Sequence, residues 1–103
     1  MEKWILDELK KSQGKQGITI QKVPHSFTTN SVQLTFDKGA VLPIHTTPVD
    51  VLFYVIKGKG KLTVGSETSE CEEGSYMESP KDIPHGWENV GDDILKILVI
   101  KLF

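Results

Sequence analysis

The sequence predicts an all-β protein of one domain, and three observations lead to that prediction. From Ile18 onward, runs rich in β-branched and aromatic residues alternate with turns containing Gly, Pro, Asp and Asn. About eight or nine such runs follow one another at short spacing, which is typical of an antiparallel sandwich or barrel. The connections are too short for the crossover helices that parallel strands require. With 103 residues and no linker-like segment, we expect a single domain over residues 1–103.

The first dozen residues leave two interpretations open. They can form a short helix with Ile5 and Leu9 on one side, or a short edge strand followed by a turn, and Gly14 and Gly17 end either element. Residues 26–31 are expected to form a turn. The strands are expected at residues 18–23, 32–36, 41–45, 50–56, 61–64, 69–73, 75–79, 83–90 and 94–103.

Two of these strands carry apolar residues on both faces. They are residues 51–56 and, apart from Lys96, residues 94–100. A strand with one face in water would alternate apolar and polar residues, so both faces of these strands must be covered. We expect the second face to form a homodimer interface; a sandwich that packs both faces within one chain is the alternative.

Composition indicates which partners and which compartment to expect. A formal net charge of -2 gives no basis for binding nucleic acid or an anionic membrane, so we expect neither partner. The single cysteine, Cys71, excludes an internal disulfide, and the charged N-terminal residues do not form a signal peptide. The longest apolar run is too short to cross a bilayer. We therefore expect a cytoplasmic protein.

The three histidines occupy different contexts. His25 follows Pro24 and is expected to be a solvated loop residue, with no role assigned. His45 and His85 each lie at the end of an apolar strand, where both can face the same interior. Imidazole is a common metal ligand and also an acid or base near neutral pH, so these two are the candidate functional residues.

The segment containing His45 and His85 resembles the paired motifs of the cupin superfamily. The first motif, G-x5-H-x-H followed by E-x6-G, is partly filled within residues 39–60. The second motif, G-x5-P-x-G-x2-H-x3-N, spans residues 74–89, with Asp82 in place of its second glycine. The matching residues are Gly39, His45, Gly58, Gly74, Pro80, His85 and Asn89.

This resemblance implies a double-stranded β-helix, a small jelly-roll barrel with an internal pocket. In such proteins the motif histidines and glutamate hold a divalent transition metal such as Fe, Mn, Ni, Cu or Zn. Carried over by position, the resemblance leaves His45 and His85 as ligands, with Thr47 and Val51 in place of the second histidine and the glutamate. Because a transition metal generally needs at least three protein donors, Thr47 or Asp50 would have to supply the third.

Strand alternation predicts which side chains surround the two histidines. If His85 faces inward, so do the residues at even spacing from it, and the same applies to Val51 on its own strand. The expected pocket-lining residues are Val51, Phe53, Ile83, Trp87 and Asn89. The alternatives are plain core packing for Phe53 and Trp87, and a turn-capping role for Asn89.

Three functions follow from these observations. The favoured one is a small cupin-fold protein that binds a small-molecule ligand, with or without a divalent metal, in the barrel interior. The second is a metal-dependent enzyme of the dioxygenase or isomerase type that uses His45 and His85. The third is a metal-free sugar isomerase or epimerase with a histidine as base and Tyr54 or Tyr76 as acid; alternation turns Tyr54 outward, which disfavours it.

Overall fold

A computed structural model of the chain describes residues 1–24 and 29–102, and it confirms the all-β prediction. One 3-10 turn, η1 (Leu6–Glu8), precedes ten strands. The strands are β1 (Lys11–Gln13), β2 (Ile18–Lys22), β3 (Thr29–Phe36), β4 (Val41–His45), β5 (Val51–Lys57), β6 (Lys59–Val64), β7 (Glu67–Glu72), β8 (Tyr76–Ser79), β9 (His85–Asn89) and β10 (Leu95–Leu102). His25 lies outside the described residues.

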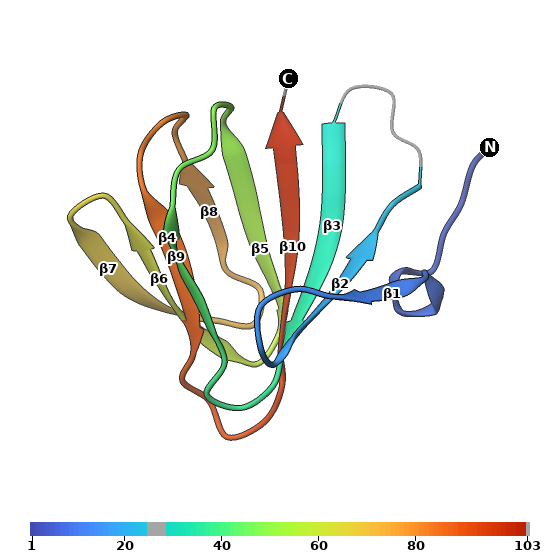
Figure 1. The fold of residues 1–103 in the computed structure, drawn as a ribbon, viewed down its shortest axis with the longest axis horizontal. Coiled ribbons are helices and arrows are strands. Elements are labelled where there is room, and N and C mark those ends of the chain that lie inside the picture. Colours follow the sequence, from blue (N-terminus) through green and yellow to red (C-terminus); the bar gives the residue numbers. More distant parts are fainter. Residues whose placement is uncertain (25–28, 103) are drawn as a thin grey trace.

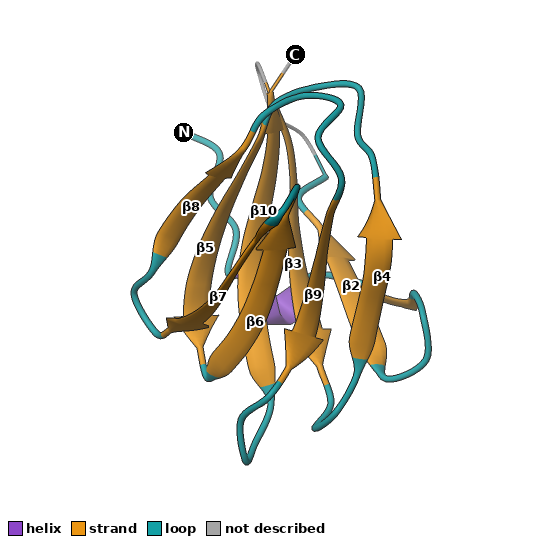
Figure 2. Cartoon of the chain, turned by 90° about the vertical axis from the view of Figure 1, so that its left-hand side faces the viewer, coloured by secondary structure: helices purple, strands orange, loops and turns teal. Residues whose placement is uncertain are grey.

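The strands form two antiparallel sheets that face each other. The larger sheet has six strands in the order β1-β2-β3-β10-β5-β8, and the smaller has four in the order β4-β9-β6-β7. In Figure 1 the two sheets approach each other at the lower end and diverge at the upper end. Figure 2 looks onto the smaller sheet, with the larger sheet behind it. We call the two ends the narrow end and the wide end.

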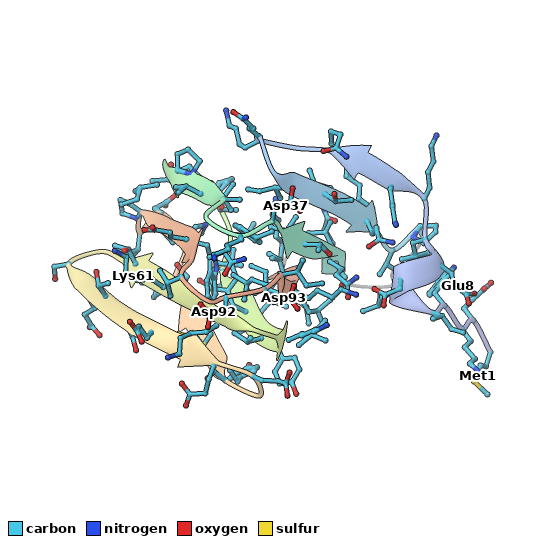
Figure 3. All side chains as sticks on the ribbon, turned by 90° about the horizontal axis from the view of Figure 1, so that it is seen from below. Met1, Glu8, Asp37, Lys61, Asp92 and Asp93 are labelled. Atoms are coloured by element: carbon cyan, nitrogen blue, oxygen red, sulfur yellow. The ribbon has the colours of Figure 1, made fainter. Side chains whose placement is uncertain are left out.

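Apolar side chains from both sheets fill the space between them. The largest fully buried ones include Trp87 from the smaller sheet and Phe36, Leu95 and Ile97 from the larger. Figure 3 looks into the narrow end, where Asp37, Asp92 and Asp93 lie in the turns that close it. Within the described residues no helix is long and apolar enough to cross a membrane.

The structure departs from the expected elements at several places, among them β6 and β7, which each begin two residues earlier than expected. The N-terminal segment contains both alternatives, since the short turn η1 is followed by the edge strand β1. The expected turn at residues 26–31 is wrong in its second half, because β3 already begins at Thr29 and pairs with the end of β10. The strand expected at residues 83–90 begins only at His85, because Asp82 has a φ of 66° and turns the chain before it.

The N-terminal segment covers part of the outer face of the larger sheet. Asp7 accepts hydrogen bonds from Gln33 Nε2 at 2.7 Å and from Lys96 Nζ at 2.9 Å. Gln21 Nε2 donates to the backbone carbonyls of Asp7 and Leu9, both at 3.0 Å. These bonds explain why two outward-facing glutamines are almost fully buried, since a buried amide needs partners.

Asn89 fastens the narrow end. Its side-chain amide is buried and donates to the backbone carbonyls of Phe36, Asp37 and Asp93 at 2.9 to 3.2 Å. Its side-chain oxygen accepts from the backbone of Gly91 at 3.0 Å. One side chain therefore joins the turn after β3 to the turn after β9.

Replacing Asn89 by alanine is expected to destabilise the fold, because the carbonyls of Phe36, Asp37 and Asp93 lose the buried donor that they share. We expect the free energy of unfolding to fall by about 2–3 kcal/mol, measured by urea denaturation. Asn30→Ala provides the control, since Asn30 is exposed. Equal stabilities of the two variants would contradict the fastening role.

Candidate ligand pocket at the wide end

A cavity of about 210 Å³ opens between the two sheets at the wide end. Its walls are mainly apolar, and His45, Thr47 and His85 supply polar groups on the side of the smaller sheet and the loop after β4. Pockets for drug-sized ligands occupy about 300–1,000 Å³, so this one suits a smaller molecule. The lining residues are Ile20, Lys22, Val32, Leu34, Leu42, His45, Thr47, Val51, Phe53, His85, Val99 and Lys101.

His85 is a buried imidazole with a hydrogen-bond partner on each ring nitrogen. Its Nδ1 lies 2.7 Å from Ser79 Oγ, and its Nε2 lies 3.3 Å from Thr47 Oγ1. A neutral imidazole has one donor and one acceptor nitrogen, and either hydroxyl can take the complementary role. Burial first, and then the charges of His45 and Lys101, lower the pKa of His85 from 6.5 to about 4. His85 is therefore neutral at neutral pH.

His45 is held by its own strand, and its exposed ring forms part of the pocket wall. Its Nδ1 lies 2.9 Å from the carbonyl oxygen of Pro43. A carbonyl only accepts, so Nδ1 carries the hydrogen in this bond and Nε2 of the neutral ring is left as an acceptor. The ring packs edge-on to His85, with 4.7 Å between centroids, and it lines the cavity. The structure thus brings the two predicted histidines together.

The loop after β4 fixes the two candidates for a third metal donor in different places. Thr47 is buried, and its backbone carbonyl accepts from the backbone of Asp82 at 2.9 Å, which holds its hydroxyl against His85. Asp50 is exposed, and its carboxylate accepts from the backbone of Lys81 at 2.8 Å. Thr47 therefore reaches the pocket, whereas the carboxylate of Asp50 is used to anchor the loop after β8.

Two of the predicted lining residues line the pocket and three do not. Val51 and Phe53 face it from β5. Ile83 is 39% exposed, because it precedes β9 and the strand alternation does not extend to it. Trp87 packs behind Phe53 in the core, at 5.5 Å between ring centroids. Asn89 lies at the opposite end of β9 from His85, where it has the turn-capping role described above.

Tyr54 and Tyr76 are paired on the outer face of the larger sheet and do not reach the pocket. They face each other across β5 and β8 and are 41% and 58% exposed. This confirms the outward orientation expected for Tyr54 and removes the phenolic acid that the isomerase hypothesis required.

Sequence reasoning missed Ser79, Lys22 and Lys101. Both lysines line the pocket from the larger sheet. Alternation along β2 and β10 could have identified them, because each lies two residues beyond an inward-facing apolar residue, Ile20 and Val99 respectively. Alternation alone does not single them out, because a lysine at the end of a strand is usually solvated.

Comparison with known proteins decides the family. Residues 32–101 match the family described as "Cupin domain". The chain belongs to the cupin family. It is 28% identical over 100 residues to an uncharacterized protein of Methanocaldococcus jannaschii, covering 89% of this chain and 78% of the other. It is also 30% identical over 88 residues to an uncharacterized protein of Aquifex aeolicus, with 84% and 73% coverage.

Solved structures of other proteins share the fold. KdgF from Halomonas sp. superimposes with a TM-score of 0.87 at 24% identity, covering 100% of this chain and 94% of that one. The polyketide cyclase RemF from Streptomyces resistomycificus gives a TM-score of 0.86 at 17% identity, with 99% and 79% coverage. At such identities the similarity shows only that these proteins share the barrel fold. The activity of this cupin has to be inferred from its own pocket.

The lowered pKa of His85 predicts an acid-sensitive fold in the metal-free protein. The folded-state pKa of about 4 lies below the ordinary 6.5, so between these values the unfolded chain binds more protons. Stability is therefore lost as the pH falls through this window, by on the order of 3 kcal/mol. Urea denaturation at pH 7 and pH 4 measures the loss. In His85→Asn, which retains a polar group for Ser79, the loss is expected to be smaller by that amount; equal losses would contradict the assignment.

Proposed function

We propose that this cupin binds a small organic molecule in the wide-end pocket. The observation that supports this most directly is the composition of the cavity, in which apolar walls surround a few convergent polar groups. That combination is the usual make-up of a small-molecule site. His45 Nε2 offers a hydrogen-bond acceptor in it, and Phe53 offers an aromatic wall that is also in edge contact with His85.

The donor set does not fit a metal ion held by the protein alone. Within the described part of the chain, no cluster of three or more His, Cys, Asp or Glu side chains can hold an ion. Thr47 is a neutral donor whose hydroxyl is already directed to His85, and Asp50 bonds to Lys81. Two imidazoles fall short of the three donors that zinc or non-haem iron sites use. The proposed function therefore includes no resident metal and no step that depends on one.

Neither enzymatic alternative has a complete set of groups in this pocket. The metal-dependent one lacks donors, and the metal-free one lacks the tyrosine acid that it requires, since both tyrosines lie on the outer face. Ligand binding requires only the groups that line the cavity. It is therefore the function that the geometry supports best.

The test is to fill the cavity and measure binding. Val32 is half-buried and lines the pocket, so Val32→Phe should occupy its volume and abolish the binding of small molecules detected with a fragment library by amide chemical shifts. Thr63→Phe makes a similar enlargement on the outer face of the smaller sheet and should leave binding unchanged. Shifts that persist in Val32→Phe would place the ligand elsewhere. Elemental analysis after incubation with Fe, Mn, Ni, Cu or Zn should find less than one ion per chain.

We also propose that two chains pair through the outer face of β5 and β10. Leu52, Ile56, Leu98 and Ile100 are half-buried there and form an apolar surface beside Tyr54. The N-terminal segment covers the neighbouring part of the sheet, through Gln21 and Gln33, and no element of the described chain is hydrogen-bonded beyond β8. An apolar surface of this kind suits a second copy of itself.

Sedimentation measurements test this pairing. The unmodified chain should sediment as a dimer, and Leu98→Glu should sediment as a monomer because it buries a charge in the interface. Thr63→Glu, on the outer face of the smaller sheet, should remain dimeric. A monomeric unmodified chain would contradict the proposal.

A further inference from the structure

Two lysines give the pocket a positive side. Lys22 ends β2 and Lys101 lies near the end of β10, both on the inner face of the larger sheet. Lys22 is paired in register with Val32, which is itself paired with Val99, two residues before Lys101. Both lysines thus lie at the wide end of the same sheet face. Lys101 is near enough to the opposite wall for its charge to contribute to the lowered pKa of His85.

Among the described residues, no carboxylate balances these charges. The residues that line the cavity include two lysines and two histidines but no Asp or Glu. The ion pairs found among residues 1–24 and 29–102 join Lys59 to Glu70, Lys61 to Glu88 and Lys96 to Asp7, and none of them uses Lys22 or Lys101. Asp50, adjacent to lining residue Val51, is directed to the backbone of Lys81. In a small cavity with apolar walls, unbalanced ammonium groups favour an anion.

The wall opposite the two lysines, which contains His45, offers the same ligand a different interaction. His45 Nδ1–H is bonded to Pro43, so Nε2 accepts a hydrogen bond from whatever enters the pocket. The remaining walls of the cavity are mainly aliphatic side chains together with the ring of Phe53. A complementary molecule therefore carries an anionic group at one end, an apolar body and a hydroxyl donor at the other end.

We infer that the ligand of this pocket is a small hydroxycarboxylic acid, whose carboxylate lies between Lys22 and Lys101 and whose hydroxyl donates to His45 Nε2. The inference rests on the proposed function, since it names the chemical class that the same pocket takes. The apolar wall limits the body of the acid to a short aliphatic chain or a single ring, in keeping with a cavity of about 210 Å³.

The experiment compares matched acids and amides on the full chain at pH 7 and low ionic strength. The probes are 4-hydroxybenzoate with 4-hydroxybenzamide and 3-hydroxybutyrate with its amide, titrated against amide chemical shifts of the pocket residues. We expect at least one acid to bind roughly tenfold more tightly than its neutral amide, because the carboxylate forms charge-assisted hydrogen bonds. Added salt should reduce this preference, since the lysines are partly exposed to solvent. 4-Methoxybenzoate, which has no hydroxyl hydrogen, should bind more weakly than 4-hydroxybenzoate.

Substitution of the two lysines tests whether they cause the preference for acids over amides. Lys22→Met with Lys101→Met retains the aliphatic stems and should abolish the advantage of acids over amides, whereas Lys57→Met, at an exposed position, should retain it. If the amides bind at the pocket as tightly as the acids, the inference fails while the proposed binding function stands. An acid preference that survives in the double variant also overturns it. If no probe shifts the pocket amides, the inference and the proposed function both fail.

Discussion

A single interior between two sheets has to serve as both hydrophobic core and binding pocket, and the rest of the structure depends on how that interior is divided. The division is made along each strand. On β2, β9 and β10 the inward positions toward the narrow end carry mainly large apolar residues, and the last inward position at the wide end is Lys22, His85 or Lys101. Burial of Trp87 and its neighbours stabilises one end, and the diverging sheets at the other end leave room for polar groups.

His85 shows what this division requires of a polar residue close to the core. It is only 3% exposed, so a protonated ring would carry a positive charge that neither water nor a neighbouring anion stabilises. Hydroxyl groups of Ser79, at the end of β8, and of Thr47, in the loop after β4, satisfy the neutral ring. In this cupin a hydroxyl contact thus occupies the side of His85 where the resemblance implies a metal ligand set.

How much of the structure can be predicted from the sequence depends on which features are determined by residues that are close together in the chain. The fold could be predicted because turn residues and alternating strands are local patterns, and the motif spacing placed His45 and His85 together. Ile83 and Asn89 were misplaced for a different reason. Alternation holds only within a strand, and neither the left-handed conformation of Asp82 nor the carbonyls that surround Asn89 can be read from neighbouring residues. Lys22 and Lys101 could have been found by the same alternation, but their joint position depends on β3 lying between β2 and β10.

The separation of Asn89 from His85 along β9 has a consequence for how such a barrel can diversify. The bonds that close the narrow end join backbone carbonyls of turns, so they depend little on what the side chains at the far mouth are. Residues at the wide end can therefore be substituted, so that the pocket accepts a different class of ligand, while the turns at the narrow end keep the chain folded. The valine at position 51, where the resemblance implies a glutamate, is compatible with this arrangement, because Val51 packs in the hydrophobic core and takes no part in the bonds that close the narrow end.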